Sequence, residues 1–223
     1  MEKKALQKII KEFFTPFARQ HNFKFYKTTL MLRVLDDTLH IINFDLPSNG
    51  LNCNIAIQPL YIPSETITLT FGNRLNHFKT NLPGTWGYSN DKIDIEKDLS
   101  QVKELLEQNA VPWFNEFGSP EGIISFIEAN LAEDDNNNIV GFPPVLKRIY
   151  LGFSYLYTNK LGLAVNLLQE VLELCKEDKR AWVIQQNEMI DNILILTEKE
   201  PDKVNTRLNE FVKATKENLK IKL

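Results

Sequence analysis

Hydrophobic residues near the start of the chain recur at the spacing of an amphipathic helix. The pattern i, i+3, i+4, i+7, i+8, i+11 is filled by Leu6, Ile9, Ile10, Phe13, Phe14 and Phe17. Pro16 lies inside this pattern. Because proline lacks the backbone N–H that a helix interior uses, we expect a kink there or a restart with Thr15 as the cap. The apolar face predicts a helix that packs on a sheet.

Farther along the chain, short apolar runs alternate with turn residues, which predicts strands. The runs cover residues 23–26, 29–35, 38–45, 51–60 and 66–71, with a turn at Asp36 and Asp37. Such short connections favour an antiparallel meander, because a parallel pair needs a crossover of about a dozen residues or more.

Residues 72–95 form a long irregular segment that contains Trp86, and loops of this length are often functional. Helical spacing returns over residues 99–106, with Asp98 and Ser100 as candidate caps. A short aromatic helix is predicted over residues 111–117. Another helix is predicted from Ser119, as N-cap before a proline, to about residue 131.

The polar run at residues 133–138 contains no apolar side chain and predicts a linker. It divides the chain into an α+β domain with an antiparallel sheet (1–132) and an all-α helical C-terminal region (139–223). Four helices are expected there, over about 144–158, 161–176, 179–199 and 202–220. Small residues at Gly152 and Ala164 match one tetratricopeptide-like helix pair. A repeat array needs about three such units, so a helical hairpin of the core is the better interpretation.

The stretch HIINFDLPSNGLNCNI (residues 40–55) predicts a hairpin with a defined register. Alternation places His40, Ile42 and Phe44 on one face. A loop with an even number of residues sets them beside Cys53, Ile55 and Ile57, whereas an odd loop sets them beside asparagines. The favoured register gathers four polar side chains on the other face, which are Asn43, Asp45, Asn52 and Asn54.

Two interpretations of this polar face stay open. In the first, it is the solvent-exposed face of a half-covered antiparallel sheet, with side-chain amides bridging neighbouring strands. Alternatively, it is a concave carboxamide surface that binds a polar ligand or a strand or loop of a partner. Leu39 and Ile41 lie on the same face and favour something that covers it.

Composition excludes few classes of protein. The net charge of −3 and a pI of about 5.7 argue against a general binder of nucleic acid or anionic membrane. Cys53 and Cys175 are isolated, so we expect reduced thiols. The sequence has neither a signal-peptide pattern nor an apolar run long enough for a membrane span, which predicts a cytoplasmic protein.

Sequence patterns of catalysis are not found. None of the three histidines, His21, His40 and His77, has a second ligand at a metal-binding interval, so we expect no metal or cofactor. Nucleophile-elbow, phosphate-loop and dinucleotide motifs are also missing from the sequence, which weakens the case for an enzyme. Arg74, His77 and nearby aromatic residues resemble a stacking platform for nucleic acid. With few basic groups, the aromatic residues are better explained as pinning the loop to the sheet.

The order of several short motifs resembles a bacterial domain-of-unknown-function family, number 4304, over about residues 1–130. The motifs are HNFKFY (21–26), LHIINF (39–44), LNCNIAI (51–57), Trp86 and VPWF (111–114). Asn22 and Asp45 stand where the family usually has glycine and glutamine. The resemblance implies an α+β fold and no enzymatic residues. It also suggests a toxin-neutralising role, because such small domains occur near toxin–immunity loci.

These observations predict a non-catalytic protein-binding module. Its expected binding residues are Asn43, Asp45, Asn52, Asn54, Arg74, His77 and Trp86. The alternative is a small-ligand-binding protein or hydrolase. In that case a pocket would lie between the 72–88 segment and the sheet, with Trp86 as its wall.

Overall fold

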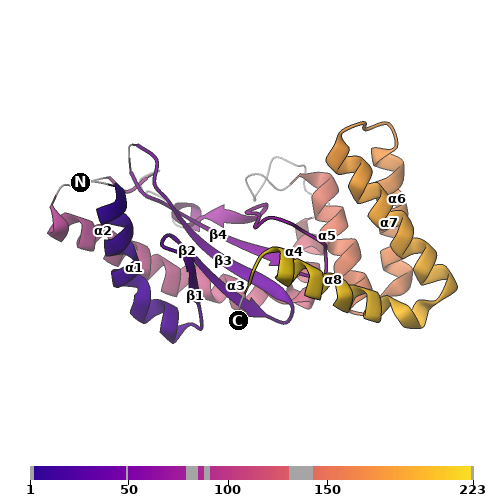
Figure 1. Ribbon diagram of the computed structural model, residues 1–223, viewed down its shortest axis with the longest axis horizontal. Coiled ribbons are helices and arrows are strands. Elements are labelled where there is room, and N and C mark those ends of the chain that lie inside the picture. The colour runs from indigo at the N-terminus through magenta and orange to yellow at the C-terminus, as the bar shows by residue number, and fades with distance from the viewer. Residues whose placement is uncertain (1–2, 49, 79–84, 88–90, 131–142, 222–223) are drawn as a thin grey trace.

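The computed structural model describes residues 3–48, 50–78, 85–87, 91–130 and 143–221. It confirms the predicted class, because an N-terminal helix precedes a five-stranded antiparallel sheet and a helical region follows (Figure 1). The strands are β1 (Lys24–Lys27), β2 (Leu30–Leu35), β3 (Thr38–Asp45), β4 (Asn52–Pro59) and β5 (Phe71–Arg74). The helices are α1 (Lys3–Gln20), α2 (Lys92–Leu105), α3 (Val111–Phe117), α4 (Pro120–Asn130), α5 (Pro144–Tyr157), α6 (Leu161–Cys175), α7 (Ala181–Lys199) and α8 (Val204–Asn218).

The sheet is a meander in which each strand pairs with the next one along the chain. Its central hairpin has the predicted register, because His40 lies opposite Ile57, Ile42 opposite Ile55 and Phe44 opposite Cys53. The connecting loop, residues 46–51, has an even number of residues, as the pattern required. Asp36 and Asp37 both have positive φ, of 47° and 52°, and form the predicted tight turn between β2 and β3.

The fifth strand was predicted too early, over residues 66–71, and β5 instead begins at Phe71. Residues 60–70 are held across the sheet by Gln58. Its Nε2 donates to the Thr66 carbonyl at 3.1 Å, and its Oε1 accepts from the Thr68 N–H at 2.9 Å. Gly72 then lets β5 approach β4, because a Cβ there would lie 2.2 Å from the Ile55 carbonyl oxygen.

Two predicted helix boundaries were also wrong. Helix α1 continues through Pro16 to Gln20, and the Thr15 hydroxyl donates to the Lys11 carbonyl instead of capping a new helix. Helix α2 begins before Asp98, at Lys92, because the Asp91 carboxylate caps it by accepting from the Ile93 N–H at 2.8 Å.

Helix α2 leads through a π-helical turn (Leu106–Ala110) into α3, which has its predicted bounds. The predicted Ser119 cap of α4 is also confirmed, since its hydroxyl accepts from the Gly122 N–H. Two 3₁₀ turns, η1 (Leu75–Phe78) and η3 (Pro201–Lys203), complete the elements.

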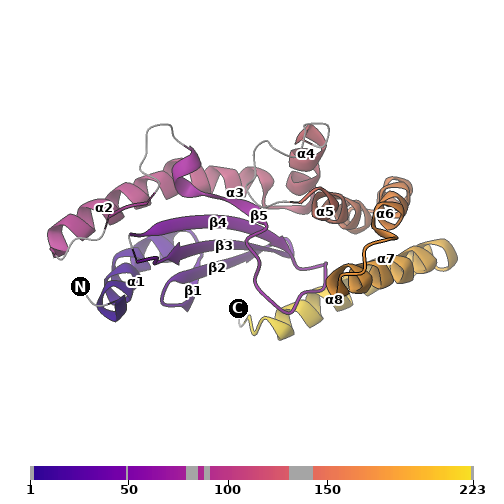
Figure 2. The ribbon, with the colours of Figure 1, turned by 90° about the horizontal axis from the view of Figure 1, so that it is seen from above.

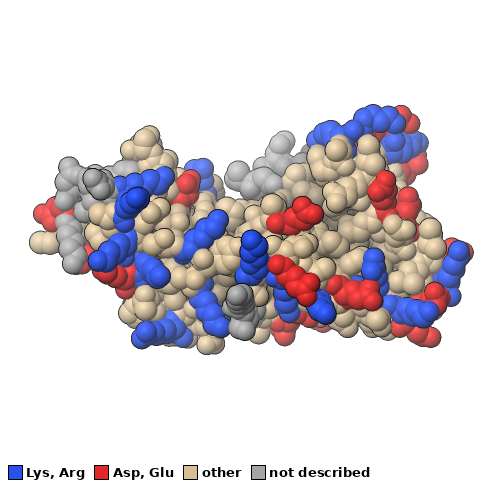
Figure 3. Space-filling model, in the orientation of Figure 1, with Lys and Arg blue, Asp and Glu red and all other residues tan. Residues whose placement is uncertain are grey.

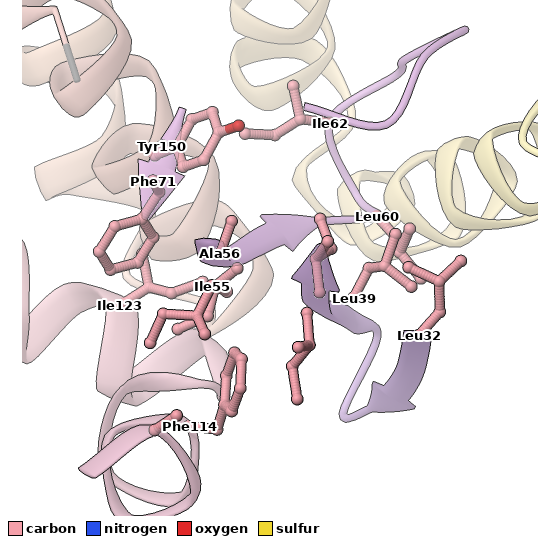
Figure 4. Packing of buried hydrophobic residues seen from close by; sticks show 14 of the residues in the cluster. Leu32, Leu39, Ile55, Ala56, Leu60, Ile62, Phe71, Phe114, Ile123 and Tyr150 are labelled. Carbon is pink, nitrogen blue, oxygen red and sulfur yellow. The ribbon is translucent and has the colours of Figure 1, made fainter. Parts of the chain in front are cut away.

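The two faces of the sheet have different covers (Figure 2). The first face carries His40, Ile42 and Phe44 and packs against helices. Phe14 of α1 lies 4.6 Å from Phe44 between ring centroids, and Phe114 of α3 stacks on His40 at 5.0 Å. The second face, on the opposite side, is covered over part of its length by residues 60–70 and by α8. Figure 4 shows Leu32, Leu39 and Leu60 beside this last helix.

The helical region is fastened to the sheet at the β2–β3 turn. The Asp37 carboxylate accepts from the Tyr157 hydroxyl at 2.8 Å and pairs with the Lys216 ammonium at 2.7 Å. Tyr61 and Ser154 share a buried hydrogen bond of 2.7 Å nearby. The predicted linker at 133–138 lies outside the described residues, and the regions on either side of it share one hydrophobic core.

The α5–α6 hairpin has the close approach that its small residues predicted. A Cβ on Gly152 would lie 2.6 Å from the Leu168 side chain, and Ala164 is fully buried.

Replacing Asp37 by asparagine is expected to lower the free energy of unfolding by about 1–2 kcal/mol, because a charged acceptor and a partly buried ion pair are lost. Asparagine tolerates the positive φ of this position, so the turn itself is retained. Urea unfolding followed by circular dichroism measures the change. The matched control is Asp36→Asn, an exposed neighbour in the same turn. Equal effects of the two substitutions would contradict the fastening role.

Candidate functional site

The structure brings together five of the seven predicted binding residues on the second face of the sheet. Asn43 lies opposite Asn54, which lies opposite Arg74 on β5, so the three form one row across the strands. Asp45 lies opposite Asn52 in the next row. This arrangement follows directly from the register of the central hairpin.

This polar part of the second face is the part that residues 60–70 and α8 leave partly open. Leu39 and Ile41 are fully buried, whereas Asn43 and Asn54 are half-buried and Asp45 is exposed. Leu39 and Ile41 are therefore covered by the same chain, whereas the expectation that something covers the polar part of this face stays a prediction. Asn52 is 6% exposed, and its Oδ1 has no hydrogen-bond partner among the described residues.

Trp86 and His77 do not join this group. Trp86 is 2% exposed, bridges Leu51 next to β4, and donates its Nε1–H to Gln101 of α2 at 2.7 Å. His77 is exposed in η1, with its Nδ1 2.9 Å from the Asn73 Oδ1. The indole thus pins its segment to α2, as expected for the aromatic residues of this loop. Residues 79–84 and 88, which belong to the segment of the predicted ligand pocket, lie outside the described residues.

Beside the polar row, three hollows that share walls lie along residues 62–70. The first, of about 440 Å³, lies between Asn43, Leu69 and Asn218. The second, of about 560 Å³, lies between residues 63–66 and helices α7 and α8. They meet at Glu65, Thr66 and Asn218. The third, of about 130 Å³, shares Pro63, Ser64 and Gln186 with the second. The three hollows thus adjoin one another along residues 62–70, and together they are here called the second-face groove.

The groove is lined mainly by uncharged polar and by half-exposed apolar side chains. Its carboxamides are Asn43, Gln185, Gln186, Asn192 and Asn218. Three large apolar side chains border it, which are Tyr26 (37% exposed), Leu69 (38%) and Trp182 (41%). Only Asn43 was predicted from the sequence. The others come from helix surfaces and a loop, where glutamine, asparagine and single apolar residues are ordinary and carry no signal.

Charges along the groove are balanced. Lys27 and Arg207 line it together with Glu65 and Glu188, and Arg207 already pairs with Glu210 at 2.7 Å. On the face drawn in Figure 3, acidic and basic side chains are interspersed near α8, whereas the end with α1 and β1 shows more basic ones. Such a groove has no strong preference for an anion or a cation.

A larger hollow, of about 630 Å³, lies between α8 and Asp37. Its charged lining is mainly Lys213, Lys216 and Lys220, near the C-terminus of α8, where positive charge complements the helix dipole. Lys216 is also paired with Asp37. These lysines are accounted for by stabilisation of the helix, so volume alone does not make this hollow the better site.

The titratable residues on the first face are structural. His40 is fully buried, its Nδ1 lies 2.9 Å from the Arg33 guanidinium, and its Nε2 lies 2.9 Å from the Gly118 carbonyl oxygen. Because arginine only donates, Nδ1 is the acceptor and Nε2–H donates to Gly118. Burial lowers the pKa of His40 to about 4, and the nearby Arg33 charge acts in the same direction. His40 is thus the satisfied core histidine that its position predicted.

The two thiols have the same character. Cys53 and Cys175 are buried and unpaired, as expected for reduced cysteines, and burial raises the pKa of both. Within the described ranges, no three histidine, cysteine or acidic side chains are grouped as metal ligands. The helices in those ranges include none that is long and apolar enough to cross a bilayer.

Comparison of the chain with models of protein families, with curated proteins and with solved structures finds no match. The resemblance to family 4304 therefore stays a prediction, and the argument for function rests on the groove.

Proposed function

We propose that this protein is a non-catalytic protein-binding module that holds an extended polypeptide segment of a partner in the second-face groove. The observation that carries the proposal is that three hollows with shared wall residues adjoin one another from Asn43 on the sheet to Trp182 on α7. An elongated site of this kind suits a chain better than a compact small molecule.

The lining supports a polypeptide as the occupant. An extended segment presents backbone N–H and C=O groups along its length, and each side-chain carboxamide offers both a donor and an acceptor. The half-exposed Tyr26 and Trp182 add apolar contact area, and such aromatic residues are enriched in protein interfaces. Balanced charge is consistent with recognition by hydrogen bonds and apolar contacts. The family resemblance further suggests a toxin as the partner.

Photo-crosslinking in the native cell tests the proposal. A photoreactive phenylalanine derivative replaces Gln186 in the groove and, as control, Gln169 on the exposed side of α6. We expect one protein to crosslink from Gln186 and not from Gln169. Equal crosslinking from both positions would contradict a groove-specific partner.

The purified partner then tests the contribution of the carboxamides. The triple variant Asn43→Ala, Gln186→Ala, Asn218→Ala is expected to bind about tenfold or more weakly in calorimetry, since a net hydrogen bond contributes about 0.5–1.5 kcal/mol. Gln169→Ala should bind like the wild type, and urea unfolding verifies that all variants are folded. Unchanged affinity of the triple variant would refute the proposed groove interface.

A further inference from the structure

The end of the second-face groove nearest α5 narrows to the hollow of about 130 Å³, here called the end hollow. Its walls come from three parts of the chain: residues 58–70, α5 and the first turn of α7. The apolar part of the wall includes Ile62, Leu146, Ile149 and Trp182. Figure 4 shows Ile62 beside Tyr150, which also lines the hollow.

The Gln58 amide, deep in the end hollow, is already engaged within the chain. Gln58 is 2% exposed and uses both ends of its amide on residues 66 and 68. An incoming group therefore meets the apolar side chains of the wall beside an amide that is already paired.

The mouth of the end hollow is formed by a constrained aromatic side chain. Trp182 is 41% exposed, and the Arg180 guanidinium lies 4.8 Å from its ring centroid. Arg180 is itself held by the Asp178 carboxylate. Because Arg180 contacts one side of the indole and the other side is exposed, Trp182 can pack against an apolar side chain that enters the hollow.

The volume limits what can enter. Pockets for small-molecule ligands typically measure about 300–1,000 Å³, so the end hollow is too small for one. It equals the volume of only about four water molecules, at about 30 Å³ each. We propose that the end hollow receives one branched aliphatic side chain, leucine or isoleucine, of the polypeptide segment bound in the groove. This inference rests on the proposed function and adds a sequence requirement to the partner.

A phage-displayed library of random linear peptides, selected on the full-length protein, tests the inference. We expect the selected peptides to share one leucine or isoleucine position. Alanine at that position in a synthetic peptide should weaken binding about tenfold or more, as expected for the loss of a buried aliphatic side chain. Selected peptides without a shared aliphatic position would overturn the inference.

A filling substitution locates the contact. Leu146→Phe narrows the end hollow, so the variant should bind the leucine-containing peptide about as weakly as the wild type binds the alanine-substituted peptide. The affinity of the variant for the alanine-substituted peptide should be little lower than that of the wild type. Ile62→Phe, from the opposite wall, provides a second test if the first variant unfolds. The control Leu163→Phe lies on α6, 53% exposed, and should bind both peptides like the wild type. If the losses of affinity caused by Leu146→Phe and by the alanine substitution in the peptide simply add, the peptide side chain does not lie in the end hollow, and the inference is overturned.

Isobutanol separates the two proposals, because it probes the end hollow without a peptide. Its binding should shift the NMR signal of the Trp182 indole N–H in the wild type and not in Leu146→Phe. If isobutanol shifts the Trp182 signal but no peptide is selected from the library, the end hollow is still a site for aliphatic groups and the proposed function is refuted. Peptide binding without a shift in either protein would overturn the end-hollow inference alone.

Discussion

Replacing Gly118 by alanine is expected to lower the free energy of unfolding by about 3 kcal/mol, at the upper end of the usual cost of overpacking. Gly118 ends α3 directly above His40. A Cβ there would lie 2.3 Å from His40 Nε2 and 2.2 Å from the Phe114 carbonyl oxygen. Its φ of −83° is allowed for any residue, so the cost is steric and not conformational. Urea unfolding followed by circular dichroism gives the change.

Gly162 provides the matched control for this prediction. It lies on the exposed side of α6, and a Cβ there would meet no atom within 4 Å. Gly162→Ala should raise the free energy of unfolding, by up to about 1 kcal/mol, because alanine is the better helix former. An unchanged unfolding midpoint in Gly118→Ala would mean that α3 can move away from the sheet at this point.

Acid is expected to destabilise the protein through His40 by about 3 kcal/mol between pH 6.5 and pH 4. The pKa of His40 is lowered from an ordinary 6.5 to about 4, first by burial. Above pH 6.5 the imidazole is neutral in both the folded and the unfolded chain, so stability is unaffected. As the pH falls, the unfolded chain binds the proton and the folded chain does not, and each pH unit removes about 1.4 kcal/mol until the folded pKa is reached.

The variant His40→Gln isolates this contribution, because glutamine does not titrate. Free energies of unfolding at pH 7 and pH 4.5 should fall more steeply for the wild type than for the variant, by about 2–3 kcal/mol. His21, whose pKa is also lowered by burial, adds a loss of the same sign in both proteins. The same pH dependence in both proteins would show that His40 is protonated in the folded state.

The sequence was informative where a local pattern has a single solution. Alternation in the hairpin determined its register, and with it the row of Asn43 and Asn54, because a slip of one residue would have exposed a whole apolar face. Ser119 was identified as a cap because serine before proline has few other uses at the start of a helix. These features depend on residues that are neighbours in sequence.

Features that leave no hydrophobic pattern in the sequence were missed. Gln58 holds residues 66 and 68 across the sheet, and nothing near Gln58 in the sequence distinguishes it from a surface glutamine. Residues 66 and 68 belong to the segment that precedes the displaced fifth strand and lines the second-face groove. The Asp91 cap was overlooked because the first turn of α2 is polar and lacks the apolar spacing that marked residues 99–106.

The position of α8 on the sheet has a consequence for folding during synthesis. Leu39 and Leu60 belong to strands and a loop made early, whereas the helix that covers them is separated from Asp37 by 179 residues of sequence. At a translation rate of about 5–20 residues per second, this face stays exposed for about 10–40 seconds after its strands leave the ribosome. Contacts of such long sequence separation also slow folding. We therefore expect the nascent sheet to be recognised by chaperones that bind exposed apolar strands until α8 has been synthesised.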